Sequence, residues 1–169
     1  MRADDHAALH AMRSREDVVR WLYFEPPTEE QTRAWIEGIL ARPPETGTAL
    51  AVELRESGEL VGHLTMSVEP EHRQGEIGFI FDPDHQGRGY ATEASRALVD
   101  HAFEHYGLHR VYGRLEPRNA ASARVLEKLG MRREAHLIEN EWVKGEWQSE
   151  AVYALLAREW GAAANAERG

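Results

Sequence analysis

The stretch from residue 76 to residue 92 constrains the fold of this chain more than any other. It begins with an apolar run from Glu76 to Phe81, which is typical of a β-strand, and passes through a polar loop into a glycine-rich turn at residues 86–91. A helical pattern follows at once. Two glycines and an alanine leave backbone N–H groups uncovered, and the helix adds unpaired first-turn donors and the positive end of its dipole. The sequence therefore predicts a site for a diphosphate or a similar anion, against the alternative of a tight turn without a ligand.

Two other phosphate-binding folds use comparable turns. A P-loop needs Gly-Lys-Ser/Thr at the start of the helix, and no lysine lies near this turn. A dinucleotide-binding fold needs a third glycine where this chain has Thr92, although Glu116 after the next strand could serve as its ribose-binding acid. The dinucleotide-binding fold is therefore less well supported, but it is not excluded. The flanking order argues further against it, because a doubly wound sheet alternates strand and helix throughout and this chain does not.

Apolar periodicity and capping residues give the order of the elements. Helices are expected at 7–13 and, after a short turn from Ser14, at 28–41, where Thr28 and Gln31 form a capping-box pattern. The remaining expected elements are strands at 48–54, 60–68 and 76–81, a helix to about 106, a strand at 110–115, a helix at 120–129, and a hairpin of 131–143 with 147–156. The first three strands should pair antiparallel, and the strand at 110–115 should run parallel to 76–81 after its crossover helix. Residues 1–160 are predicted to form a single domain, and the small, polar residues 161–169 a disordered tail.

Composition limits the class of protein. The 169 residues suit one domain with one core, and no apolar run approaches the eighteen residues of a membrane span. No positively charged start leads into an apolar stretch, so no signal peptide is expected. Cysteine is absent, which excludes thiolate chemistry and agrees with a cytoplasmic location. The net charge of −9 disfavours nucleic-acid binding; it either serves solubility alone or attracts a basic acceptor.

Two blocks of residues resemble the GNAT acyltransferase superfamily. Its signature Arg/Gln-x-x-Gly-x-Gly/Ala is matched in full by Gln86-x-x-Gly89-x-Ala91. The second block reads Pro117-x-Asn119-x-x-Ser122, followed by Leu126-Glu-Lys-Leu-Gly130-Met131. These blocks in this order are similar to the branch that contains the RimJ/RimL-type ribosomal-protein N-terminal acetyltransferases. The similarity covers roughly residues 3–160.

The resemblance implies an α+β GNAT fold. Such a fold has a central, mixed, mostly antiparallel twisted sheet with helices on both faces, splayed between the strands at 76–81 and 110–115. The family usually begins with a strand ahead of the first helix, whereas this sequence starts at the helix. The strand at 48–54 would then lie at an uncovered edge, which favours pairing with another chain as a homodimer.

The resemblance also implies an acetyl-CoA-dependent N-acetyltransferase that joins amine and thioester directly, without an acyl-enzyme and without a metal. The pantetheine arm would pair with the strand backbone, and Asn119 would bind its amides or act only as a helix cap. The residues implied in cofactor binding are Phe79, Ile80, Phe81, Gln86, Gly87, Arg88, Gly89, Tyr90, Ala91, Thr92, Asn119 and Ser122.

The catalytic acid and base are less strongly marked. Glu76, at the head of the splayed strand, is the expected general base, directly or through water; the alternative is a surface carboxylate. Glu53, His63 and His72 are weaker candidates. Many family members place a tyrosine acid where this chain has Leu126. The ribosomal-type branch implies Ser122 instead, as an acid, a relay or a plain first-turn serine.

The acceptor amine is expected between residues 21–24 and the last hairpin. Acidic and aromatic side chains there would suit a cation, with core packing as the alternative for the aromatics. They are Glu139, Glu141, Trp142 and Trp147. A protein N-terminus is the leading acceptor. A small amine, such as a polyamine or an aminoglycoside, is the second, and a non-catalytic acyl-CoA-binding module is the alternative to an enzyme.

Overall fold

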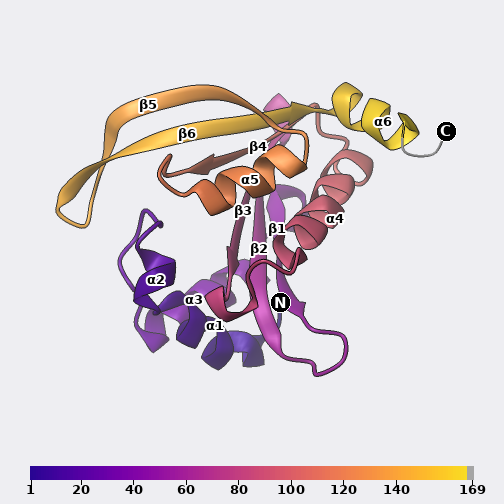
Figure 1. The fold of residues 1–169 in the computed structure, drawn as a ribbon. Coiled ribbons are helices and arrows are strands. Elements are labelled where there is room, and N and C mark those ends of the chain that lie inside the picture. The colour runs from indigo at the N-terminus through magenta and orange to yellow at the C-terminus, as the bar shows by residue number, and fades with distance from the viewer. Residues whose placement is uncertain (167–169) are drawn as a thin grey trace.

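A six-stranded mixed sheet forms the centre of the computed structural model, which describes residues 1–166 (Figure 1). Its spatial order is β1-β2-β3-β4-β6-β5. The strands are β1 (Gly47–Glu53), β2 (Leu60–Glu69), β3 (Gln74–Phe81), β4 (Arg110–Leu115), β5 (Arg132–Val143) and β6 (Glu146–Leu156). Among the strands of the described residues, β3 and β4 alone pair in parallel, and every other neighbouring pair is antiparallel. This arrangement confirms the predicted α+β class and mixed sheet.

The helices are α1 (His6–Arg13), α2 (Glu16–Val19), α3 (Glu29–Leu40), α4 (Tyr90–Glu104), α5 (Ala120–Lys128) and α6 (Ala157–Ala166). Four helices, α1, α3, α4 and α5, begin and end close to the expected residues, α2 forms in the expected short turn, and α6 was not predicted. The predicted capping box starts α3, because Thr28 and Gln31 exchange side-chain to backbone hydrogen bonds. Gly130 ends α5 in a Schellman motif, in which the amide of Met131 donates to the carbonyl of Leu126 at 3.1 Å.

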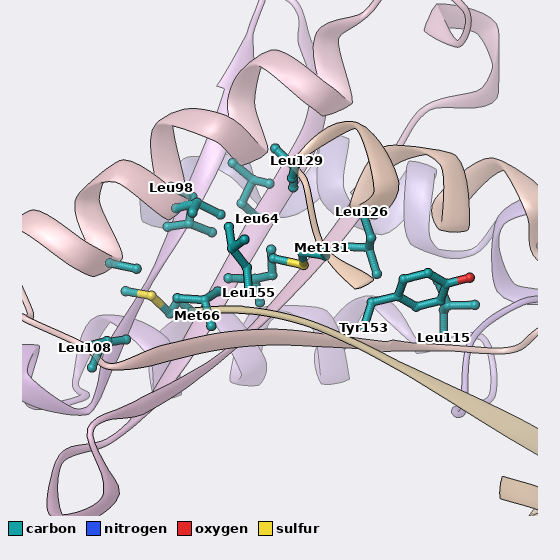
Figure 2. Packing of buried hydrophobic residues seen from close by; sticks show 14 of the residues in the cluster. Leu64, Met66, Leu98, Leu108, Leu115, Leu126, Leu129, Met131, Tyr153 and Leu155 are labelled. Carbon is teal, nitrogen blue, oxygen red and sulfur yellow. The ribbon is translucent and has the colours of Figure 1, made fainter. Parts of the chain in front are cut away.

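Strand alternation divides the apolar side chains between the two faces of the sheet. One face packs on α4 and α5 and forms the main core, around Leu64, Met66 and Leu98 (Figure 2). Gly113 of β4 lets α5 approach closely, since a Cβ there would lie 3.2 Å from both δ carbons of Leu126. The opposite face packs on α1 and α3, where a smaller cluster of Leu9, Met12 and Ile36 is joined by Trp35 and Ile80. Helices therefore cover both faces, as predicted.

The long β5–β6 hairpin arches beyond the sheet and its tip lies close to α2 (Figure 1). The turn residues Lys144 and Gly145 both have positive φ, of 54° and 77°. The ammonium of Lys144 donates to the carbonyl of Leu22 at 2.5 Å and also to the carbonyl of Val19. These bonds connect the hairpin to the segment that leaves α2.

The structure at the two ends of the chain can be compared with the predicted tail and the predicted sheet edge. The disordered tail predicted from residue 161 is wrong as far as Ala166, because α6 continues through it; residues 167–169 lie outside the described part. Alanine has the highest helix propensity, and it is frequent in this stretch. In the described chain, α1 has no strand ahead of it and β1 lies at a sheet edge; the homodimer stays a prediction. No helix within residues 1–166 is long and apolar enough to cross a membrane.

Candidate active site

β3 and β4 separate after a short paired stretch. They pair only from Gln74 with Arg110 to Glu76 with Tyr112, although both strands continue beyond this point. The edge of β3 that faces β4 is therefore free of strand pairing from Ile77 to Phe81. A cavity of about 410 Å³ opens in the gap, lined by β3, the glycine turn, α5 and residues of α2. The splay predicted between these two strands is confirmed.

The glycine turn presents its backbone to this cavity. Gly87 and Gly89 have φ of 76° and 88°, and a Cβ on either would meet nothing within 4 Å. The amide of Gln86 already donates to the carbonyl of Pro83 at 3.2 Å. No amide from Gly87 to Thr92 has a hydrogen-bond acceptor within residues 1–166, and α4 begins at Tyr90 with no side-chain cap. Free donors and a helix dipole of this kind suit an anion, and the diphosphate site at this turn stays a prediction.

Most residues expected to hold the cofactor lie on this one cavity. Those that line it are Phe79, Ile80, Phe81, Gln86, Gly87, Gly89, Tyr90, Ala91, Thr92, Asn119 and Ser122. Arg88 is not among the lining residues. Asn119 caps α5, since its side-chain oxygen accepts from the amide of Ser122 at 3.1 Å, so the cap role that the sequence left open is present. The roles of Asn119 and Ser122 in cofactor binding stay predictions.

Glu76 lies on β3, the strand whose residues 79–81 line the cavity, but it does not line the cavity itself. Its two carboxylate oxygens accept from Arg114 at 2.9 and 3.1 Å. Arg114 also donates to Glu150 at 3.3 Å, and this second carboxylate is only 4% exposed. Burial raises the pKa of Glu150 above its usual range. The catalytic role of Glu76 stays a prediction.

The three weaker candidate bases lie in different surroundings. Glu53 is paired with Arg2, and His72 is a largely exposed neighbour of Glu69. His63 is buried on the α1–α3 face of the sheet, with only 3% of its surface exposed. Burial, and secondarily the charge of Arg13, lowers its pKa to about 3, so the imidazole is neutral at neutral pH.

The two segments expected to flank the acceptor are in contact, and the acceptor site itself stays a prediction. Lys144 brings the β5–β6 hairpin against the segment after α2, and the hydroxyl of Tyr23 donates to the carbonyl of Ser149 at 2.9 Å. Trp142 and Trp147 are 61% and 56% exposed and meet edge to face, with ring centroids 5.3 Å apart. The alternative of core packing is therefore wrong for these two rings.

One network at the site was not found from the sequence. The guanidinium of Arg15 donates to Asp82 at 3.0 Å and to Asp84 at 2.8 Å, and it also binds Asp17. These bonds join the start of α2 to the turn that precedes the glycines. Arg15 lowers the pKa of Asp84. Arg15 is 67 positions from Asp82 and 69 positions from Asp84 in the sequence, so no local spacing indicates these contacts.

Comparison with known proteins decides the family. The family model described as an acetyltransferase (GNAT) domain matches residues 1–132. This chain belongs to the GNAT acetyltransferases. It is similar to the uncharacterized N-acetyltransferase YnaD of Bacillus subtilis, with 31% identity over 92% of this chain and 90% of that protein. As a GNAT enzyme it is an acetyl-CoA-dependent N-acyltransferase.

Solved structures agree with this GNAT assignment. A GNAT-family acetyltransferase from Bacillus anthracis superposes with a TM-score of 0.85 and 32% identity, over 94% of this chain and 93% of that one. The spermidine N-acetyltransferase of Vibrio cholerae, solved with CoA and spermine, gives a TM-score of 0.84 over 95% and 94% of the two chains. At 20% identity, this second likeness shows the fold alone.

Proposed function

We propose that this GNAT enzyme acetylates the amino group of a protein N-terminus, as the RimJ/RimL-type residue blocks suggest. Acetyl-CoA would lie in the gap between β3 and β4, with its diphosphate on the free amides of residues 87–92. The observation that carries the proposal is the set of unbonded amides at the head of α4, which opens onto the same cavity as β3. The pantetheine would add to the free edge of β3 as a strand does.

The chemistry needs one bond made and one broken. The amine nitrogen attacks the thioester carbonyl, the C–N bond forms and the C–S bond breaks, so that CoA leaves as a thiolate. An N–H of β3 between Phe79 and Phe81 would polarise the carbonyl, and a preorganised donor of this kind lowers a barrier by roughly 3 kcal/mol in other enzymes. Glu76 would take the amine proton through water, since Arg114 occupies both of its oxygens. Ser122, which lines the cavity, would hydrogen-bond the departing sulfur.

A small amine is the second candidate acceptor. It is favoured by the likeness in fold to the Vibrio cholerae enzyme, which was solved with spermine. The net charge of −9 suits a cationic acceptor of either kind. Release of free thiol from acetyl-CoA, measured against a panel of peptides and of small amines, separates the two candidates. Turnover of polyamines but of no peptide would refute the N-terminal acceptor.

The role of Glu76 is tested by Glu76→Gln. We expect kcat to fall by about 100-fold or more with little change in CoA affinity, because positioned bases contribute about 10²–10⁴ in rate. Glu134→Gln is the matched control, since Glu134 also accepts from an arginine of β4, Arg110, and does not line the cavity. Equal kcat values in the two variants would remove Glu76 from the mechanism.

A further inference from the structure

The last residue of α1 is a buried cation that no acid within residues 1–166 neutralises. Arg13 is 8% exposed, and its Nε and Nη1 atoms are buried without a hydrogen-bond acceptor in residues 1–166. Its Cζ atom lies 4.0 Å from the ring centroid of Trp35 and 5.1 Å from that of Phe24. The rings offer the cation their π faces, but no oxygen along its N–H bonds. Burial lowers the pKa of Arg13 to about 10, so it keeps its charge at neutral pH.

His63 lies in the same apolar surroundings and is equally unpartnered. Neither ring nitrogen has a hydrogen-bond partner in the described chain, and its ring meets that of Trp35 with centroids 5.2 Å apart. A neutral imidazole supplies one N–H donor. Arg13 and His63 therefore offer several donors with little accepting capacity between them. The complementary group is a planar acceptor that carries negative charge, which is a carboxylate.

These donors lie next to the strand expected to hold the thioester. His63 of β2 pairs with Ile80 of β3, and Ile80 both lines the cofactor cavity and packs in the cluster that includes Trp35. Acids on the two strands that flank β2 are engaged elsewhere: Glu53 of β1 is paired with Arg2, and Glu76 of β3 with Arg114. In the described chain, no carboxylate comes within 4.0 Å of the Arg13 guanidinium.

We propose that Arg13 and His63 bind a carboxylate of the acceptor molecule. The amine that is acetylated would then belong to a molecule with a carboxylate a few bonds away, either a free amino acid or a peptide with an acidic side chain next to its N-terminus. This inference rests on the proposed amine acetylation. It adds that donors on the α1–α3 face of the sheet select acceptors that carry a negative charge. The protein's net charge of −9 would by itself repel such acceptors.

The test compares acceptors that differ only in this carboxylate. Free amino acids are assayed against their amides, and peptides with Glu at the second position against peptides with Gln, by thiol release at saturating acetyl-CoA. In whichever acceptor class the enzyme prefers, amino acids or peptides, we expect kcat/KM to be at least 10-fold higher with the carboxylate than with the matched amide, mainly because KM is lower. A ratio near one in both sets would overturn the inference while leaving amine acetylation intact.

Arg13 is tested by Arg13→Gln, which should bring the carboxylate preference close to one without changing the rate with the amide. Arg13→Lys should restore part of it. Arg96→Gln is the matched control, because Arg96 also stacks on a tryptophan, Trp160, at 5.3 Å, and lies on α4 on the other face of the sheet. CoA affinity within about twofold of the parent value shows that a variant is folded. A preference that survives Arg13→Gln would overturn the assignment.

A binding experiment on the parent protein needs neither turnover nor a variant that folds. The indole N–H resonance of Trp35 is followed during titration with N-acetylglycine and with N-acetylglycinamide. We expect a saturable shift with the acid and at least 10-fold weaker binding of the amide. Equal responses, or none, would refute the carboxylate site. If no amine of either kind is acetylated but the acid still shifts Trp35, the proposed function fails and the site stands.

Discussion

The diphosphate site can be tested with two glycines that share a backbone conformation and differ in position. Gly89 has φ of 88° and lies in the turn ahead of α4, whereas Gly58 has φ of 72° and lies in the β1–β2 connection. A Cβ on either would meet no atom within 4 Å. Gly89→Ala and Gly58→Ala therefore impose a similar backbone strain and no steric clash. Only Gly89 lines the cofactor cavity.

The two expected magnitudes follow from this geometry. An alanine in the left-handed region costs roughly 1–2 kcal/mol, which is partly offset by lower entropy of the unfolded chain. Each variant should lose about 1 kcal/mol of stability, or about 2–4 °C in Tm for a domain of this size. In Gly89→Ala the new methyl group is also added at the cavity that Gly89 lines, where the diphosphate is proposed to bind. Loss of one charge-assisted hydrogen bond, worth about 1.5–3 kcal/mol, weakens CoA binding by about tenfold or more.

The assay is calorimetric titration with CoA well below either Tm, together with thermal unfolding of the free proteins. We expect the two variants to unfold at similar temperatures, with CoA affinity reduced only in Gly89→Ala. Equal CoA affinities in the variants would refute the diphosphate site at this turn. A loss of affinity in Gly58→Ala of the same size would show that the effect reflects general destabilisation.

Two further predictions concern buried polar groups. The folded pKa of His63, about 3, lies below its unfolded value of about 6.5, so between these limits only the unfolded chain takes up the proton. The free energy of unfolding should therefore fall as pH drops through this window, by up to about 1.4 kcal/mol per pH unit more than in His63→Gln, in urea titrations at pH 7, 6 and 5; identical slopes would contradict this. Lys144→Met removes the ammonium that donates to the carbonyls of Val19 and Leu22, of which Val19 keeps the amide of Leu22 as a donor, and should cost about 1–3 kcal/mol, with faster amide exchange in the hairpin than in β4. Unchanged exchange at the hairpin tip would show that Lys144 does not hold it.

Local signals predicted the order of elements closely. The capping box at Thr28 and the left-handed glycine at Gly130 are formed by residues within a few positions of one another, so the sequence alone displays them. Strand periodicity and short connections predicted the antiparallel pairs β1–β2, β2–β3 and β5–β6, and the crossover helix predicted the parallel pair β3–β4; the pairing of β6 with β4 was not predicted. The splay was expected through the resemblance, and the end of strand pairing at Glu76 and Tyr112 confirms it.

The interpretations that failed depended on features without a distinctive local pattern. An alternating hairpin strand gives the same pattern whether its apolar side faces a core or solvent, so Trp142 could not be assigned to either. Small residues after 161 were taken for a tail, although an alanine-rich run is also a good helix. The network of Arg15 depends on long-range folding and gives no signal in spacing.

The sequence does not reveal that Arg13 and His63 lie in one cluster either, because they are brought together only by folding. The free-energy cost of burying them unpaired distinguishes them from an ordinary core pair. Each buried donor without an acceptor costs about 1–3 kcal/mol, and a charged one costs more. A cation–π contact with Trp35 or Phe24 returns about 0.5–2 kcal/mol. The balance is unfavourable in the free protein, and an apolar pair of similar volume would fill the space at lower free energy. A carboxylate acceptor reverses that balance, because it supplies the missing hydrogen bonds in a site of low dielectric next to the strand where acetyl transfer is expected.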